Sequence, residues 1–341
     1  MPSSHYHTII IGAGPGGLSC AQILASQGRR VLVLEKNEII GPKVCAGGVT
    51  CAGAAAAIPP ELIERQFNRQ HISSGRQQIV VSAQKPIVST INRGNLGERQ
   101  AGEARAAGAT IMTGCRLRQL TGREIRSSGG NFSCDFLVGA DGANSLVRRH
   151  LKIPTEFMGL GLHYHIPEHL PKMIWHLDPQ RFATGYCWVF PQARRASVGV
   201  YCYKKDMAPG LLKERFHSWL DEEKIDWRQA HRPEAAHINF DFRGYAFGST
   251  FLVGDAAGLA SGLTGEGILP AIISGQEVAR RILEPGYKAP RLSRLIRNQR
   301  RHRRLLLAAS KHPRLTPLAM EALILALKMK LIHFSALEMT D

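Results

Sequence analysis

The sequence predicts an α/β fold, α+β overall, in which a Rossmann-type nucleotide-binding domain carries an inserted antiparallel β-sheet and a C-terminal helical tail. Three observations predict it. A strand, glycine turn, helix and strand open the chain, short aromatic segments alternate through its middle, and a basic helical stretch ends it. The predicted domains are 1–70, 93–155 and 245–285 for nucleotide binding, 71–92 and 156–244 for the antiparallel sheet, and 286–341 for the tail.

The first element is a glycine-rich turn between a buried strand and a helix. Residues 8–11 are typical of a strand buried on both faces, and Gly12, Gly14 and Gly17 match the G-x-G-x-x-G pattern before a helix at 18–27. Gly12 permits the tight turn, Gly14 lets the backbone approach a pyrophosphate, and Gly17 lets the helix pack close to the strand. The turn therefore predicts a dinucleotide site at a helix N-terminus.

Acidic residues follow three buried strands. Glu35 ends the strand at 31–34, where its carboxylate can bind both hydroxyls of an unphosphorylated ribose, as in FAD or NAD. Asp141 and Asp255 follow two further apolar strands in the same way. A glycine-rich helix start at 265–268 can present N–H groups to a flavin edge that becomes negative on reduction.

Composition and charge indicate the kind of partner and the cellular compartment to expect for this protein. The formal net charge of +17 predicts attraction to an anionic surface or substrate. Seven cysteines without a C-x-x-C pair indicate reduced thiols and a cytoplasmic location rather than a disulfide framework. We expect neither a secretion signal nor a spanning helix, because no signal-like segment and no run of about 18 apolar residues occurs.

A glycine-rich loop follows the first nucleotide-binding unit. It spans 41–51 and contains Lys43, Cys45 and Cys51. Its small side chains allow the backbone to lie flat against a ligand. We expect residues 52–69, which come next, to be helical.

Five motifs together carry a resemblance to a known family. The segments 12–17, 139–142 and 253–258 resemble the FAD-dependent group typified by p-hydroxybenzoate hydroxylase. Within that group, 43–49 and 185–191 resemble the geranylgeranyl reductase family, which saturates carbon–carbon double bonds of isoprenoids. The resemblance covers about residues 5–285 and implies FAD as the cofactor.

The resemblance also implies which residues line the FAD. These are Gly12, Gly14, Gly16, Gly17, Glu35, Cys45, Ala46, Gly48, Arg93, Asp255, Gly267 and Ile268, and we add Lys36, Asp141 and Gly265 from the same turns. Arg93 corresponds to the arginine of an R-x-x-F-D pattern. In this chain Leu96 and Gly97 stand where that pattern has phenylalanine and aspartate.

Cys45 is the candidate catalytic residue. Its thiol can donate the proton that accompanies hydride delivery from the flavin to an alkene. Two alternatives remain: Cys45 packs in its loop as a small, weakly polar residue, or it forms a redox pair with Cys51.

Tyr186, Trp188 and Phe190 lie two apart and therefore share one face of a predicted strand. They form either the aromatic wall of a hydrophobic substrate pocket or ordinary core. His163 and His165 also share a strand face. We expect no metal site there, because no third ligand is near in sequence.

The tail is strongly basic. No acid occurs between Glu284 and Glu321, and Leu292, Leu295 and Ile296 lie opposite the arginines of a predicted helix. The helix is either a peripheral contact with anionic lipid or a solvated basic face packed by its leucines. No nucleic-acid-binding motif accompanies the charge, so we expect no nucleic-acid partner.

The predicted function is reduction of double bonds in an isoprenoid or similarly apolar substrate by an FAD enzyme. Its flavin would receive electrons from NAD(P)H or from a ferredoxin-type protein, and the sequence does not choose between them. The alternatives are an aromatic-ring monooxygenase of the same fold and a flavoprotein that binds lipid or senses redox state without turnover. The sequence does not predict the oligomeric state.

Overall fold

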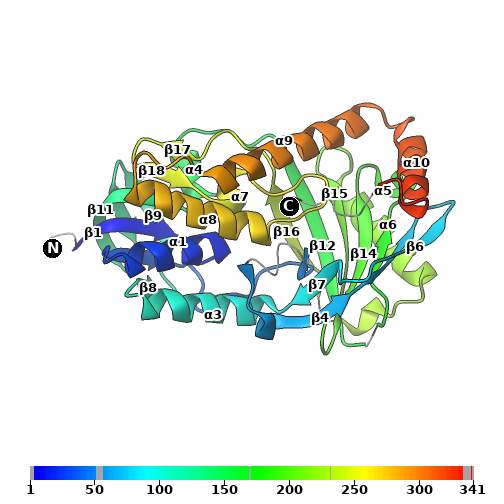
Figure 1. Cartoon of the computed structure of the whole chain (residues 1–341), viewed down its shortest axis with the longest axis horizontal. Coiled ribbons are helices and arrows are strands. Elements are labelled where there is room, and N and C mark those ends of the chain that lie inside the picture. The colour runs from blue at the N-terminus through cyan, green and yellow to red at the C-terminus, as the bar shows by residue number, and fades with distance from the viewer. Residues whose placement is uncertain (1–3, 51–56, 169, 231, 333–338, 340–341) are drawn as a thin grey trace.

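The computed structural model describes residues 4–50, 57–168, 170–230, 232–332 and 339. The described residues form three β-sheets, with helices packed around them (Figure 1). An eight-stranded sheet with helices packed on it occupies one end, a seven-stranded sheet occupies the other, and a three-stranded sheet lies between them. The mixed α/β fold class predicted from the sequence is confirmed.

The eight-stranded sheet has a parallel centre. Its order is β17-β18-β11-β1-β2-β8, and all of these strands except β17 run parallel, while β9 and β10 continue from β11 as an antiparallel meander. The carboxyl-terminal residues of β1 and β11 and all of β2 are buried, because side chains pack on both faces of the sheet there. The bounds are β1 (Ser4–Ile11), β2 (Val31–Leu34), β8 (Thr110–Met112), β9 (Leu117–Thr121), β10 (Glu124–Ser127), β11 (Gly130–Gly139), β17 (Ala246–Phe247) and β18 (Thr250–Leu252).

Parallel pairing brings the three predicted acids to one edge of this sheet. β1 lies between β2 and β11, so the strand order reverses at β1, which is where such sheets bind ligands. Glu35 follows β2, Asp141 follows β11, and Asp255 follows β18. Because parallel strands end at the same edge, these acids surround the turn that Gly12 begins.

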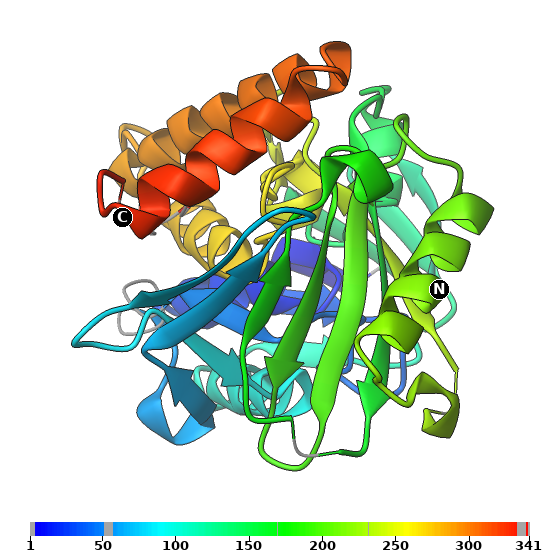
Figure 2. The same cartoon turned by 90° about the vertical axis from the view of Figure 1, so that its right-hand side faces the viewer.

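The seven-stranded sheet shows the predicted alternation of faces. Its order is β16-β12-β15-β14-β13-β5-β6, antiparallel except between β13 and β5. Cys187 and Val189 of β14 pack with helix α6, which lies along this sheet in Figure 2, and the aromatic residues of β14 form a separate cluster on the other face. The bounds are β5 (Arg69–Ser73), β6 (Gln78–Ser82), β12 (Met158–Ile166), β13 (Ile174–His176), β14 (Tyr186–Pro191), β15 (Ala196–Tyr203), β16 (Glu234–Asn239) and α6 (Pro209–Glu222).

The helix predicted at 52–69 is wrong from residue 58 onward, although Ala57 is helical. The chain instead forms a short 3₁₀ turn and then strands β4 and β5. Pro59 and Pro60 remove two backbone donors, and β4 pairs with β7 and buries Phe67. Residues 52–56 lie outside the described part. The bounds are η1 (Pro60–Leu62) for the turn, and β3 (Gly48–Thr50), β4 (Ile63–Phe67) and β7 (Val88–Ile91) for the three-stranded sheet.

Strands β5 and β6 join the seven-stranded sheet although they precede the second nucleotide-binding segment in sequence. That sheet therefore takes strands from two separate stretches of the chain, as an inserted domain would. The domain boundaries given above remain a prediction.

Helices cover the parallel sheet and close the far end of the molecule. Helix α1 crosses α8 where Gly16 meets Gly275, and a side chain at either position would overlap the backbone of the other helix. The bounds are α1 (Pro15–Ser26), α3 (Arg93–Ala106), α4 (Leu146–His150), α5 (Pro179–Phe182), η2 (Trp227–Gln229), α7 (Gly254–Ala257), α8 (Ile268–Leu283), α9 (Pro290–Lys311) and α10 (Thr316–Lys328).

The two tail helices pack by one face each. Leu292 and Leu295 of α9 are buried, as in the second of the two alternatives for this helix, while most of its arginines are exposed. Helix α10 packs Ile324 and Leu327 against strands β5 and β6 (Figure 2). No helix within the described residues is long and apolar enough to cross a membrane.

A close contact holds the loop at 41–48 against α3. The side chain of Asn92 caps this helix by accepting hydrogen bonds from Gly94 N (2.8 Å) and Asn95 N (3.3 Å). A Cβ atom at Gly97 would overlap the backbone of Gly41, whose φ of +108° favours glycine. This contact explains why an aspartate does not fit at position 97 of this chain.

We expect Gly97→Ala to destabilise the protein by about 1–3 kcal/mol, because the methyl group must displace the Gly41 backbone. Gly102→Ala in the same helix is the matched control, since a Cβ atom there has open space. Helix propensity predicts that this control stabilises by about 0.5–1 kcal/mol. Urea unfolding curves of both variants measure the difference, and equal effects would contradict the contact.

Candidate functional site

A continuous cavity of about 720 Å³ joins the edge of the parallel sheet to the seven-stranded sheet and α10. Every predicted site residue except Gly17 lines it. These are Gly12, Gly14, Gly16, Glu35, Lys36, Cys45, Ala46, Gly48, Arg93, Asp141, Tyr186, Trp188, Phe190, Asp255, Gly265, Gly267 and Ile268. The fold thus gathers residues that are up to 256 positions apart (12 to 268) around one space.

The glycine turn forms one end of the cavity. Gly12 has φ +105°, and a Cβ atom there would lie 2.5 Å from the Ala140 carbonyl oxygen. Gly17 lies beneath the turn, where a side chain would overlap the Gly12 carbonyl, so its role is packing. No side chain caps α1 after Gly14, and its first turn holds no acid. Its N–H groups are therefore available to an anion.

Glu35 ties the second strand to the glycine turn. Its Oε2 accepts a hydrogen bond from Ala13 N (2.8 Å), and its Oε1 accepts one from Asn37 N (2.9 Å). The side chain is buried at the cavity wall. Each carboxylate oxygen has a further lone pair, so the group can hold the turn and accept hydrogen bonds from ribose hydroxyls together.

The other two acids have different surroundings. Asp141 Oδ2 accepts hydrogen bonds from Leu146 N (2.6 Å) and Val147 N (3.3 Å) and so caps α4, while burial raises the pKa of this carboxyl. Asp255 forms an ion pair with Lys43, whose Nζ lies 3.1 Å from Oδ2. Sequence reasoning missed this pair because 212 positions separate its members.

The cysteine loop is held from two sides. Gly47 O accepts a hydrogen bond from Ile91 N (2.9 Å), and Ala46 O accepts one from Gln192 Nε2 (3.4 Å). Cys45 is partly buried, and its Sγ accepts a hydrogen bond from Gly47 N (3.4 Å). Cys51, its proposed redox partner, lies outside the described residues.

Arg93 lines the cavity at the start of α3. Its Nε is buried and has no hydrogen-bond partner among the described residues. A buried guanidinium donor without a partner is costly. The position therefore suits a ligand that supplies an acceptor.

Aromatic side chains form the wall at the seven-stranded sheet. Trp175 of β13 packs against the predicted wall. Its ring centroid lies 5.5 Å from that of Tyr186, with the rings tilted, and 4.8 Å from that of Phe190, with the rings edge to face. The Tyr186 hydroxyl donates to the Thr264 carbonyl, and burial raises the pKa of this phenol. Phe190 packs so closely on Gly48 that any side chain there would overlap its ring. The wall therefore touches both loops beside the predicted flavin position.

Sequence reasoning missed the apolar end of the cavity. Trp175 lines it from β13, and Met320, Leu323 and Leu327 line it from α10. The three α10 residues recur at helical spacing, which was the signal available. Their contact with the cavity depends on how α10 docks, which spacing does not reveal.

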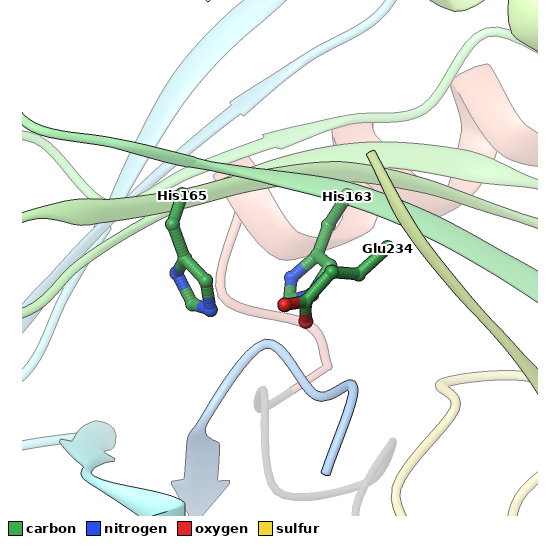
Figure 3. Close-up of side chains that lie close together, drawn as sticks. All are labelled: His163, His165 and Glu234. Carbon is green, nitrogen blue, oxygen red and sulfur yellow. The ribbon is translucent and has the colours of Figure 1, made fainter. Parts of the chain in front are cut away.

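His163 and His165 have a third neighbour. Glu234 on β16 lies opposite His163, with its Oε2 3.1 Å from His163 Nε2 (Figure 3). The expectation that no third ligand is in reach is wrong. Glu234 lies 71 positions from His163 in sequence but beside it across the strands. Burial lowers the pKa of His163, and burial with the Arg195 charge lowers that of His165 to about 4.

Two family models match the chain in the places where the cavity is built. The NAD(P)-binding Rossmann-like domain matches residues 10–56, and the FAD binding domain matches residues 118–285. The first covers the glycine turn and Glu35, and the second covers Asp141 and Asp255. FAD is therefore the cofactor.

Curated relatives match most of the chain. A geranylgeranyl diphosphate reductase from Rhodobacter capsulatus is 28% identical over 83% of this chain and 77% of its own length. A digeranylgeranylglycerophospholipid reductase from Methanothermobacter thermautotrophicus is 29% identical over 82% of this chain and 79% of its own length.

A solved structure supports the fold. The geranylgeranyl bacteriochlorophyll reductase-like protein of Thermoplasma acidophilum has a TM-score of 0.81 at 21% identity, over 96% of this chain and 92% of that one. With the FAD model, the named relatives and the cavity geometry in agreement, the chain is an FAD-dependent oxidoreductase that is similar to geranylgeranyl reductases.

Proposed function

We propose that this enzyme saturates carbon–carbon double bonds of an isoprenoid or similarly apolar substrate by hydride transfer from reduced flavin. The observation that carries the proposal is the continuity of the cavity, which runs from a glycine-lined nucleotide end to an aromatic and aliphatic end. An aromatic-ring monooxygenase would bind a smaller, more polar substrate, for which α10 need not line the cavity.

The residues fit FAD. In this proposal the uncapped N-terminus of α1 receives the pyrophosphate, Glu35 binds the adenosine ribose, and Asp255 lies near the ribitol. Arg93 offers its unpartnered Nε, and the uncapped start of α8 at Gly267 faces the flavin edge. Reduced FAD supplies the hydride.

The far end of the cavity binds the substrate in this proposal. Trp175, Trp188 and Phe190 offer aromatic surface, and Leu323 and Leu327 of α10 offer aliphatic surface. Such surface gains free energy when it covers an apolar chain and keeps water away from the reacting bond. The named reductase relatives act on geranylgeranyl compounds, which have this chemistry.

Alkene reduction needs a proton as well as a hydride. Cys45 lies in the loop between the nucleotide end and the aromatic wall, and it lines the same cavity as Tyr186. In this proposal the Cys45 thiol donates the proton to the second carbon of the double bond and recovers it from water. The electron donor is NAD(P)H in transient contact or a ferredoxin-type protein.

The tail supplies a peripheral membrane contact in the same proposal. The α10 apolar face, defined as Leu315, Leu318, Leu325, Met329 and Leu331, is exposed by 46–71%. Exposed Lys311, Arg314, Lys328 and Lys330 flank it. Exposed leucines beside cations suit the headgroup region of an anionic bilayer.

We expect Glu35→Gln to weaken FAD binding by roughly 5- to 150-fold. An amide offers one acceptor oxygen, so a ribose hydroxyl of FAD loses a buried acceptor at a cost of about 1–3 kcal/mol. Fluorescence titration of the apoprotein with FAD measures the change. Glu124→Gln, which alters an exposed carboxylate on β10, is the control, and equal affinities of the two variants would contradict the role.

The proposed reaction predicts anaerobic turnover. Reduced enzyme mixed with a geranylgeranyl lipid should reoxidise its flavin, and mass spectrometry should show two added hydrogens per double bond. Cys45→Ala should slow this reoxidation by roughly 10²–10⁴-fold but leave dithionite reduction unchanged. Cys20→Ala removes a buried thiol that does not line the cavity and is the control.

One outcome would contradict the proposed reaction, and another would contradict only the proton role of Cys45. Flavin that stays reduced until oxygen enters, followed by an oxygenated product, would favour the monooxygenase alternative. If Cys45→Ala reoxidised its flavin as fast as the parent protein, the enzyme would still be a reductase, but Cys45 would not be the proton donor.

The membrane contact predicts co-sedimentation with phosphatidylglycerol vesicles and weaker binding to phosphatidylcholine vesicles. Leu318→Asp combined with Leu325→Asp should lower partitioning at least roughly tenfold, because two apolar contacts are lost and two charges must be solvated. Leu211→Asp on α6, another exposed leucine, is the control. Unchanged partitioning of the double variant would contradict this surface.

A further inference from the structure

A polar cluster lies on the seven-stranded sheet, next to the substrate end of the cavity. His163 and His165 project from one face of β12, and the register of β12 with β16 sets Glu234 directly opposite His163. One ligand atom of each residue lies within 4.8 Å of the other two. Figure 3 shows the three side chains extending from the same side of the sheet.

We propose that His163, His165 and Glu234 form a binding site for a divalent transition-metal ion such as Zn²⁺. Two imidazole nitrogens and one carboxylate oxygen are a donor set that such ions prefer. Three protein ligands leave at least one coordination position for water or another oxygen donor. This ion would be additional to FAD and does not depend on the proposed alkene reduction.

The surroundings of His163 orient it for this role. Its Nδ1 lies 2.9 Å from Ser197 Oγ, which also accepts a hydrogen bond from Trp188 Nε1 (3.3 Å). When Nδ1–H donates to Ser197, the Nε2 lone pair faces Glu234 Oε2 at 3.1 Å. Two acceptors that face each other at this distance are stabilised by a cation that both can coordinate. Such an outer hydrogen bond commonly fixes the tautomer of a ligating histidine.

His165 is the ligand that must move. Ligands bound to zinc at about 2.0–2.2 Å lie roughly 3.4 Å apart, and the His163–Glu234 pair is already near that separation. The His165 ring centroid is 4.8 Å from that of His163. Its Nδ1 is buried without a hydrogen-bond partner in the described part of the chain, so this atom does not restrain the ring.

Two charged side chains near the cluster have opposite effects on the binding of a cation. Glu234 supplies a negative charge, and its side chain is half exposed, so an ion can enter without unfolding the sheet. Arg195 acts electrostatically on both histidines and opposes a cation. Its guanidinium Nε donates to Gln192 Oε1 (2.9 Å). Removing the Arg195 charge should therefore strengthen metal binding, whereas removing a ligand should weaken it.

The site adjoins the substrate end of the cavity. His163 lines the cavity, and its ring centroid lies 6.5 Å from that of Trp188. Gly199 on β15 has no side chain, and any Cβ atom there would overlap Trp188. A bound ion would therefore hold β12 to β16 beside the aromatic wall, on the same face of the sheet.

The test is a zinc titration of the oxidised, FAD-loaded protein after chelator treatment, followed by calorimetry and elemental analysis. We expect one zinc ion per chain. Glu234→Gln and His165→Ala should each weaken binding at least tenfold, and Arg195→Gln should strengthen it. His237→Ala, on the opposite face of β16, is the matched control and should bind zinc as the parent protein does.

Cobalt gives an independent readout of the ligands. Co²⁺ bound here should show no thiolate-to-metal charge-transfer absorption, because no cysteine belongs to the cluster. If His165→Ala fails to fold, as judged by circular dichroism, Glu234→Gln still decides, because that side chain is half exposed. Zinc binding that is absent, or unchanged in Glu234→Gln, would overturn the proposal and leave a histidine–glutamate hydrogen bond.

Discussion

The parallel pairing of β1 with β2 and β11 is the constraint on which the cofactor end of the molecule depends. Because parallel strands end at one edge, this pairing brings together the turn at Gly12, Glu35 after β2 and Asp141 after β11, which are distant in sequence. Glu35 then reaches back to Ala13 and holds the glycine turn in its tight conformation. In this conformation the N–H groups at the N-terminus of α1 face the cavity without a side-chain cap. Strand order thus determines where an anion can bind before any ligand arrives.

A second set of contacts joins the antiparallel sheet to that edge. Tyr186 and Tyr201 each donate a hydroxyl hydrogen bond to a carbonyl of the loop before α8, at Thr264 and Gly262. Phe190 packs on Gly48 in the cysteine loop. Both loops that border the predicted flavin position are therefore fixed by side chains of one strand and its neighbour. Movement of the sheet would alter both loops together.

Local patterns predicted the elements well and distant contacts poorly. The glycine turn, the alternating faces of β14 and the buried leucines of α9 follow from periodicities of a few residues, and all are present. The helix expected at 52–69 was wrong because prolines and a pairing with β7 outweighed local helical preference. Glu234 beside His163 and Lys43 beside Asp255 depend on strand register and loop placement, which no local period encodes.

Helix α10 connects two environments that the sequence presents separately. Its Met320, Leu323 and Leu327 line the cavity, while Leu318 and Leu325 face outward at 61% and 46% exposure. One helix thus separates an apolar chamber from an apolar surface. An isoprenoid chain that passed beside this helix would exchange one apolar contact for another. It would therefore expose little apolar surface to water, and such exposure costs about 25 cal/mol per Å². In the function proposed above, the same helix would serve membrane contact with one face and substrate binding with the other.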